Sequence, residues 1–281
     1  MVKLRELYLD GCKNLESISE ESAPFEVFQL IEKAFGINKS GYFIHSEDEV
    51  DEKSAEKFKE MLLRRKNHEP LQYILGEWEF YGLPFKVGEG VLVPRGDTEI
   101  IAETAINYIN KNNFKNMIDL CSGSGALAIA IAKNTDLEKV DAVELSKKAF
   151  SYLLQNIELN EAQNKITAYN TDIFTFENQI KYDVVVSNPP YIPTKDIEEL
   201  SQEVKQEPFM ALDGGLDGLY FYRKISELYF DKINTNGMLF FEIGINQLED
   251  VSKIMKEIGY KEINFVKDYA GIPRCVYGTK K

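Results

Sequence analysis

The stretch best suited to chemistry is Asn188-Pro189-Pro190-Tyr191, which follows the apolar run 182–186. The run is rich in β-branched residues and predicts a buried strand, and the two prolines predict a stiff turn at its end. A rigid turn suits the positioning of a weak nitrogen nucleophile, whose lone pair is delocalised in a planar group. If the Asn188 side-chain oxygen and the Pro189 carbonyl each accept one N–H, the remaining lone pair is aimed at an electrophile.

Tyr191 extends this hypothesis, because an aromatic face can cover a planar target. The same face favours a cationic methyl donor by ~1 kcal/mol. The alternative is that the four residues only end a strand in a turn with a packed tyrosine. These residues alone leave that alternative open.

Composition limits the class of partner. The chain has 281 residues, 44% of them hydrophobic, and a net charge of -13, which argues against a broad phosphate-binding surface and direct nucleic-acid contact. The cysteines are far apart and lack paired spacing, so we expect neither disulfides nor a metal site, and a reducing cytoplasm. No apolar run is long enough to span a membrane, and the charged start 1–6 does not resemble a signal peptide.

Apolar spacing divides the chain into three parts. Residues 1–76 predict a small helical domain, in which Ser22 caps a helix with Pro24 in its first turn, and a further helix covers 52–65. Residues 77–94 predict a β-hairpin linker, and 95–281 a larger domain. The apolar face expected for the second helix consists of Phe25, Phe28, Ile31 and Phe35. His45 and His68 stand alone, so we interpret them as surface or packing residues.

The second chemical signal is the glycine turn 122–125. It follows a predicted strand at 116–121 and precedes a helix from Ala126, and the next strand ends in Glu144. Glycines let a ligand approach the backbone, and a carboxylate at that strand end can bind ribose hydroxyls. Ala128 stands where a dinucleotide fingerprint has its third glycine, which variants permit. A dinucleotide site and a plain tight turn therefore both remain open.

The remaining elements complete an α/β pattern. Asp172 and Ile173 follow a strand at 166–170 and can border an adenine ring; the alternative for Asp172 is a helix or turn cap. Alternating strands and helices predict a mostly parallel sheet with an antiparallel C-terminal edge. Its later elements are helices at 97–109, begun by an Asp97 cap, and at 218–233, a strand at 237–243, a helix at 247–258, and strands near 261–266 and 274–277.

These residues resemble the class I S-adenosylmethionine-dependent methyltransferases, and within them the HemK-type release-factor glutamine methyltransferases. The turn at 188–191 is shared with adenine-amino DNA methyltransferases, whereas the segments 94–99 and 214–218 are more specific to the release-factor enzymes. The resemblance covers nearly the whole chain. It rests on Pro70 to Gly76, Phe80 to Phe85, Val91 to Arg95 with Asp97-Thr98-Glu99, the glycine turn, Asn188 to Ile192, and Ala211 to Gly218.

The resemblance implies a Rossmann-like fold of seven strands, S-adenosylmethionine as methyl donor, and a class I peptide release factor as substrate. The methylated atom is the side-chain amide nitrogen of the glutamine in a Gly-Gly-Gln motif, and the helical domain grips the release factor. Separately from the resemblance, we expect a monomer. The implied donor residues are Cys121, Ser122, Gly123, Ser124, Gly125, Glu144, Asp172, Ile173 and Asn188; the implied substrate residues are Asn188, Pro189, Pro190 and Tyr191, of which Asn188, Pro189 and Tyr191 are catalytic.

The chain departs from the family pattern at two places. Gly96 stands where proline is usual, and Cys121-Ser122 replaces the commoner Gly-Thr. Three rival functions stay in view: a DNA adenine methyltransferase, which needs a basic recognition region that this acidic chain lacks; a methyltransferase of a large-subunit ribosomal protein; and a donor-binding adaptor without catalysis. The intact turn at 188–191 argues against the last.

Overall fold

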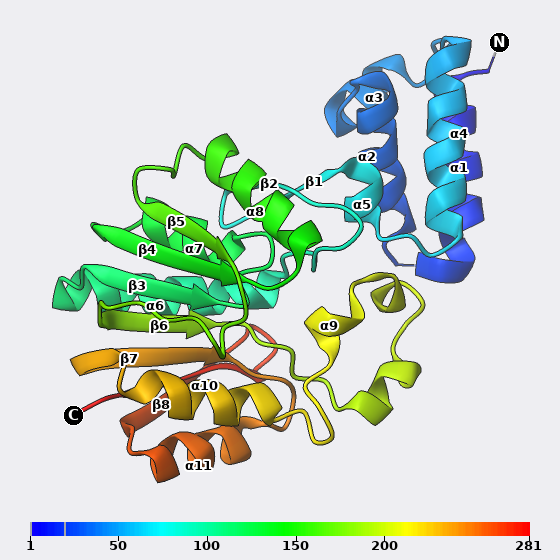
Figure 1. The fold of residues 1–281 in the computed structure, drawn as a ribbon. Helices are drawn as coiled ribbons and strands as arrows, with labels where there is room; N and C mark the ends of the chain where they lie inside the picture. Colours follow the sequence, from blue (N-terminus) through cyan, green and yellow to red (C-terminus); the bar gives the residue numbers. More distant parts are fainter. Residues whose placement is uncertain (1, 20) are drawn as a thin grey trace. The chain divides into compact units, whose positions relative to one another are not determined.

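The computed structural model describes residues 2–19 and 21–281, and its chain divides into two compact units (Figure 1). The first unit consists of residues 1–77 with 201–206, and the second of 78–200 with 207–281. Met1 and Glu20, which belong to the predicted helical domain, lie outside the described residues. No helix in the described part of the chain is both long and apolar enough to cross a bilayer.

The first unit is helical, as expected. Helix α2 begins after Ser22 and carries Pro24 in its first turn, but the Ser22 hydroxyl donates to Glu26 Oε1 at 2.9 Å instead of capping the backbone. The predicted apolar face of α2 is wrong at Phe25, which is 52% exposed, but confirmed at Ile31, which is buried together with Val27 and Leu30. The other two predicted residues, Phe28 and Phe35, are half-buried. The helices are α1 (Leu4–Ser19), α2 (Ala23–Phe35), α3 (Lys39–His45), α4 (Glu52–Lys66) and α5 (Leu71–Leu75).

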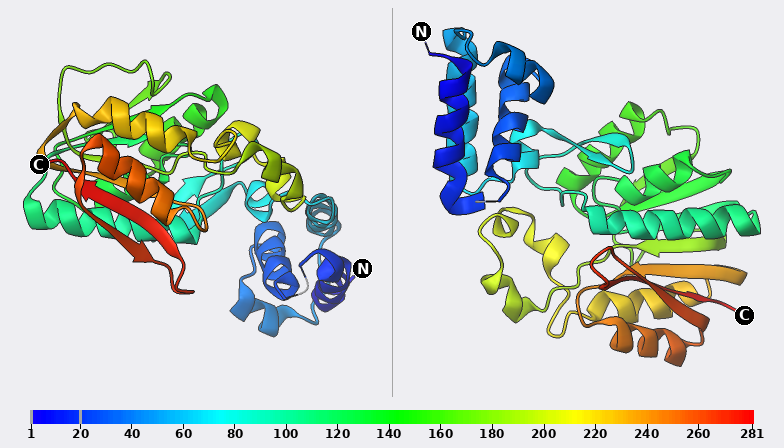
Figure 2. Two further views of the ribbon diagram at one scale, coloured as in Figure 1. Left: turned by 90° about the horizontal axis from the view of Figure 1, so that it is seen from below. Right: turned by 180° about the vertical axis from the view of Figure 1, so that it is seen from behind.

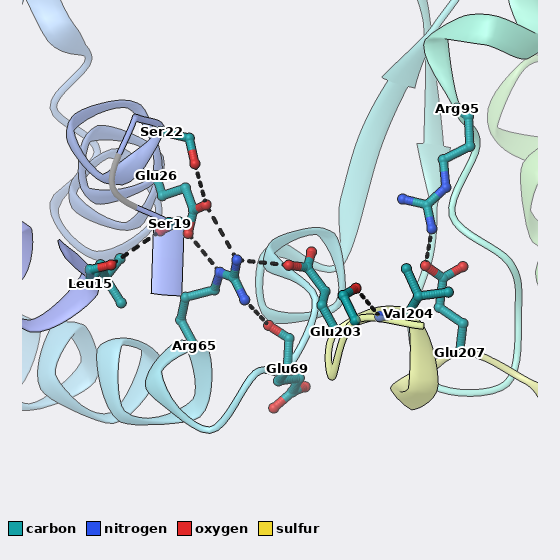
Figure 3. Close-up of polar contacts among 11 residues, drawn as sticks. Leu15, Ser19, Ser22, Glu26, Arg65, Glu69, Arg95, Glu203, Val204 and Glu207 are labelled. Carbon is teal, nitrogen blue, oxygen red and sulfur yellow. Dashed lines mark hydrogen bonds and ion pairs between the residues drawn. The ribbon is translucent and has the colours of Figure 1, made fainter. Parts of the chain in front are cut away.

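Arg65 of α4 explains why residues 201–206 belong to this unit (Figure 3). Its guanidinium is buried and donates to Glu26 Oε2 at 2.6 Å and to Glu203 Oε2 at 2.8 Å. A buried charge is tolerated only when it is paired and hydrogen-bonded. Arg65 therefore fixes Glu203, directly before the 3₁₀ turn η3 (Val204–Gln206), to the helical unit.

The second unit contains, among the described residues, a seven-stranded sheet in the order β5-β4-β3-β6-β7-β9-β8. The neighbouring strands β5, β4, β3, β6 and β7 pair in parallel, and β9 lies antiparallel between β7 and β8. This confirms the predicted fold class. The strands are β3 (Asn116–Leu120), β4 (Lys139–Glu144), β5 (Ile166–Asn170), β6 (Tyr182–Ser187), β7 (Ile233–Glu242), β8 (Lys261–Lys267) and β9 (Pro273–Thr279).

Helices cover both faces of this sheet, as a parallel sheet requires. Along β6, Val184 and Val186 pack into the core that includes α6, α7 and α8, whereas Val185 packs into the core of α10 and α11. Figures 1 and 2 show α10 and α11 together on one side of the sheet and α6 on the other. The helices are α6 (Glu99–Asn112), α7 (Ala126–Lys133), α8 (Lys147–Leu159), α9 (Phe209–Leu212), α10 (Tyr220–Phe230) and α11 (Leu248–Ile258).

Two predicted boundaries are wrong. The helix expected over 218–233 ends at Phe230, because Ile233 is buried and pairs with Tyr182, so that β7 begins before Gly237. The helix expected from Asp97 is preceded by a 3₁₀ turn, η1 (Gly96–Thr98), and Asp97 caps nothing. Its carboxylate instead pairs with Arg274 at 2.9 Å. The elements not yet located are β1 (Glu77–Phe80), β2 (Leu83–Lys86) and η2 (Thr194–Glu199), of which β1 and β2 pair.

Candidate active site

Sheet register brings the chemically suited residues to one edge. Leu120 of β3 pairs with Val143 of β4 and Ser187 of β6, and Ser187 in turn pairs with Phe241 of β7. The next residue on each strand therefore lies at the carboxyl edge of the sheet, where ligands bind in open α/β folds. These four residues are Glu144, Cys121, Asn188 and Glu242.

The glycine turn is shaped by backbone conformations that few residues adopt. Gly125 has φ 84°, and an added Cβ would lie 2.5 Å from Leu153 Cδ1, so glycine is required for close packing on α8. Cys121 also lies in the left-handed region, with φ 60°. That conformation costs a non-glycine residue roughly 1–2 kcal/mol, which explains why the resemblance expects glycine there.

Glu144 is held as a rigid acceptor at the end of β4. Its Oε2 accepts the Gly123 N–H at 2.8 Å and its Oε1 accepts the Ser146 N–H at 2.7 Å. Burial raises the pKa of its carboxyl group, and these backbone donors oppose that shift. A carboxylate offers about four lone-pair sites, so two remain for the hydroxyls of a ligand.

Asp172 caps a turn, as the alternative for this residue expected. Its Oδ1 accepts the Phe174 N–H at 2.9 Å in a local turn, which leaves Oδ2 for a ligand. Ile173 beside it is buried, and its carbonyl accepts the Tyr229 hydroxyl at 2.8 Å. The turn therefore presents one polar and one apolar group together.

One cavity, with an empty volume of about 780 Å³ including its open mouth, collects most of the predicted site residues. Its lining includes Cys121, Gly123, Glu144, Asp172, Ile173, Asn188 and Pro190. Ser122 and Ser124 line an adjoining hollow, which shares Cys121, Gly123 and Asn188. Gly125 lines neither and acts through turn geometry. Pro189 and Tyr191 also line neither hollow. The other predicted site residues converge, although they lie at the ends of four strands.

The turn at 188–191 is braced from behind. An added Cβ at Gly214 would lie 2.7 Å from Tyr191 Cα, so only glycine permits this approach. Gln247 donates to the Tyr191 carbonyl at 2.9 Å, and the Tyr191 hydroxyl points toward Glu242 Oε1 at 3.5 Å. The half-buried tyrosine ring packs against the core that includes α10 and α11. Coverage of a planar target by this ring stays a prediction.

Comparison with known proteins identifies the family. A family model described as the PrmC N-terminal domain matches residues 6–76, and one described as the TRM5/TYW2 methyltransferase domain matches 100–212. A release factor glutamine methyltransferase of Fusobacterium nucleatum subsp. nucleatum is 39% identical over 274 residues, which are 95% of this chain and 77% of the relative. The chain belongs to the release factor glutamine methyltransferase family. The release factor glutamine methyltransferase of Clostridium botulinum is 34% identical, over 99% of this chain and 99% of the relative.

Solved structures agree with this fold. The hMettl16 catalytic domain, solved with an RNA hairpin, has a TM-score of 0.58 at 13% identity and covers 81% of this chain and 82% of its own. The T. thermophilus 16S rRNA N2 G1207 methyltransferase, solved with AdoMet and guanosine, has a TM-score of 0.52 at 16% identity. The match covers 73% of this chain and 50% of that methyltransferase. Such similarity shows the methyltransferase fold. With the family, it confirms the predicted enzyme class.

Three residues close to the predicted site were not among the residues predicted for it: Thr98 and Asp119, which line the adjoining hollow, and Glu242, which is hydrogen-bonded to Thr98. Asp119 is buried; its Oδ2 accepts the Ala128 N–H at 3.2 Å, and its Oδ1 has no hydrogen-bond partner among the described residues. Burial raises the pKa of Asp119 to about 7. Its place before the glycine turn was a usable signal, as was the place of Glu242 at the end of a predicted strand.

A buried carboxylate also holds the loop before η1. Glu207 pairs with Arg95 (Figure 3), and its Oε2 accepts the Val93 N–H at 3.2 Å. Pro208 and Met210, which follow Glu207, line the cavity. Glu207 therefore connects the cavity wall to the loop that leads into η1 and Thr98.

Replacing Gly96 by proline, the residue usual in the family, is expected to raise the free energy of unfolding by ~0.5–1 kcal/mol by restricting the unfolded chain. The site accepts proline because Arg95 is extended, with ψ 145°, and Gly96 lies at the first position of η1 without positive φ. Nothing lies within 4 Å of an added Cβ. Thermal unfolding of Gly96→Pro measures the change, with Gly96→Ala as control. A lower melting temperature for the proline variant would contradict it.

Proposed function

We propose that this protein transfers a methyl group from S-adenosylmethionine to the side-chain amide nitrogen of the glutamine in the Gly-Gly-Gln motif of class I peptide release factors. The observation that carries the proposal is the position of Asn188, at the carboxyl edge of the sheet and in the same cavity as Glu144 and Asp172, in a chain of this family. Every curated relative named above is a release factor enzyme, which favours this substrate over DNA or a ribosomal protein.

The residues of the cavity fit the donor. Glu144 has spare lone pairs for ribose hydroxyls, and Asp172 with Ile173 offers an acceptor beside an apolar wall for adenine. The unpaired Oδ1 of Asp119 suits the ammonium group of the methionine part, since a buried acceptor without a partner is costly. When bound, the donor supplies a methyl group on a sulfonium sulfur, which the amide nitrogen takes as the C–S bond breaks and one amide proton leaves.

Affinity for the donor is expected to rise with pH toward 7, through Asp119. Because the pKa of Asp119 is raised to about 7 in the free protein, acid conditions hold it protonated, and a cationic ammonium group binds only its ionised form well. Binding therefore releases a proton, and affinity should be roughly tenfold weaker at pH 5.5 than at pH 7. Calorimetry at several pH values measures this, with Asp119→Asn as comparison.

The Asp119→Asn variant should bind the donor more weakly than the wild type. Its donor affinity should also change less with pH. Any pH dependence of donor affinity that remains in this variant is assigned to Glu144, whose pKa is also raised by burial. Equal pH dependence in the two proteins would show that Asp119 does not meet the ammonium group.

On the substrate side, Asn188 Oδ1 and the Pro189 carbonyl are proposed to accept the two N–H groups of the glutamine amide. Those bonds strengthen as the nitrogen loses planarity, so they favour the transition state over the bound substrate. Pro190 contributes to the cavity wall, and Tyr191 covers the amide. The reaction then depends on orientation and needs neither a strong base nor a metal ion.

The decisive experiment is mass spectrometry of an unmodified class I release factor after incubation with this protein and S-adenosylmethionine. Peptide mapping should place one added methyl group on the Gly-Gly-Gln glutamine. No methyl group there, with donor binding intact, would overturn the proposed substrate. We also propose that the protein acts in the cytoplasm as a monomer, and that residues 1–76 bind the release factor.

A further inference from the structure

We propose that Glu242 and Thr98 are positioning residues that fix the Asn188 side-chain amide with its oxygen directed toward the target. The inference rests on the proposed function, in which that oxygen accepts an N–H from the substrate. It assigns a role to two buried residues, which are 3% and 4% exposed and come from β7 and η1.

The side-chain amide of Asn188 needs a contact that fixes its orientation, because its oxygen end and its NH₂ end have nearly the same shape. Rotation by half a turn exchanges an acceptor oxygen for an NH₂ group that can only donate. An NH₂ group directed at the glutamine N–H would repel it. The reaction therefore requires a contact that distinguishes the two ends.

The structure provides that contact as a chain of hydrogen bonds. Asn188 Nδ2 donates to Thr98 Oγ1 at 3.3 Å, and Thr98 Oγ1 donates to Glu242 Oε2 at 2.6 Å. A hydroxyl group has a single proton. Once that proton is given to an ionised carboxylate, Thr98 can only accept from Asn188, so the nitrogen end must face Thr98 and the oxygen end is free.

The sheet holds this chain in place. Glu242 ends β7 directly beside the end of β6, where Ser187 pairs with Phe241. The backbone carbonyl of Glu242 accepts the Tyr222 hydroxyl at 2.9 Å, and Ile243 donates to the Arg274 carbonyl at 2.9 Å. These contacts fix the backbone of Glu242 beside the end of β6, which Asn188 directly follows.

Protonation of Glu242 would reverse the direction of the chain. A carboxylic acid can donate to Thr98, whose own proton is then free to bond the oxygen of Asn188. Burial raises the pKa of Glu242 to about 7, with Asp97 acting in the same direction and Thr98, Arg274 and Tyr191 in the other. The other titratable groups facing it are Tyr222 and Cys275. Turnover should therefore fall as pH drops below 7.

A matched pair of variants tests the role of Thr98. Thr98→Val keeps the shape of the side chain but removes the hydroxyl, whereas Thr98→Ser keeps the hydroxyl but removes a methyl group. We expect kcat of Thr98→Val for release-factor methylation to fall about five- to tenfold with donor affinity unchanged, and Thr98→Ser to stay near wild type. A purely structural role predicts the opposite order. Wild-type kcat in Thr98→Val would overturn the proposal.

A second measurement does not depend on turnover. The side-chain ¹⁵N–H signals of Asn188, assigned by their loss in Asn188→Ala, should shift with pH around 7 in the wild type and lose that shift in Glu242→Gln and Thr98→Val. If they do so while no release factor is methylated, the proposed substrate fails and the positioning role stands. If methylation occurs but the signals ignore pH and both variants, the positioning role fails alone.

Discussion

Replacing Asn188 by alanine is expected to lower the methylation rate of a release factor by about 10²–10³ while leaving most of the donor affinity. The loss is large because the Asn188 oxygen acts mainly as the amide nitrogen pyramidalises, and removal of one group aimed at developing charge costs roughly that factor. Donor affinity persists because the proposed donor ligands lie elsewhere, Glu144 at the end of β4 and Asp172 in the turn after β5. Single-turnover kinetics with saturating donor measure the rate.

Two further variants make this result interpretable. Asn112→Ala, at the exposed end of α6, removes a similar side chain far from the proposed chemistry and should keep the wild-type rate. Asn188→Asp keeps the shape and an acceptor but cannot donate to Thr98, so its rate should lie between those of wild type and Asn188→Ala. A wild-type rate in Asn188→Ala would refute the proposed role.

The sheet and the meeting of several polar residues at its carboxyl edge could be predicted because their signals are local. Strand β5 follows the predicted bounds 166–170, and the predicted strand ending in Glu144 is β4. Parallel strands place their carboxyl ends at one edge of a sheet, so Glu144 and Asn188 were expected there, and the order β4-β3-β6 makes them neighbours of Cys121, which only the family resemblance had named. The prediction required a pattern of elements and no knowledge of side-chain contacts.

The residues behind the site could not be predicted in the same way. Thr98 and Glu242 are 144 residues apart, and their hydrogen bond depends on how β7 aligns with β6. Asp97 was expected to cap a helix, but its carboxylate pairs with Arg274 on β9 and not with the backbone N–H groups of α6. Such competition is decided by tertiary structure, since capping contributes only about 1 kcal/mol.

The helical unit shows the same limit. Apolar spacing identifies α1, α2 and α4, but no local pattern assigns residues 201–206 to this unit. That assignment depends on Arg65, whose buried guanidinium requires a second carboxylate besides Glu26 and finds it 138 residues along the chain in Glu203. A buried arginine is visible only once the helices have packed.

Glu144→Ala is expected to weaken donor binding by about 10- to 150-fold, the equivalent of ~1.5–3 kcal/mol for a lost hydrogen bond to a charged acceptor. The turnover of whatever complex still forms should change much less, because the role proposed for Glu144 is to bind the ribose and not the transferred methyl group. Calorimetry of donor binding and kcat at saturating donor separate the two effects. Glu158→Ala, on the exposed face of α8, is a control that should bind normally.

Glutamine is not a neutral replacement at this position, which sharpens the test. Both carboxylate oxygens of Glu144 accept backbone N–H groups, from Gly123 and Ser146, so an amide would direct its NH₂ group at one of these donors. Glu144→Gln should therefore lose affinity despite its matched shape, and the glycine turn should loosen. Wild-type affinity in Glu144→Gln would mean that neither the turn nor the ribose depends on a carboxylate here, and the proposed donor site would have to be abandoned.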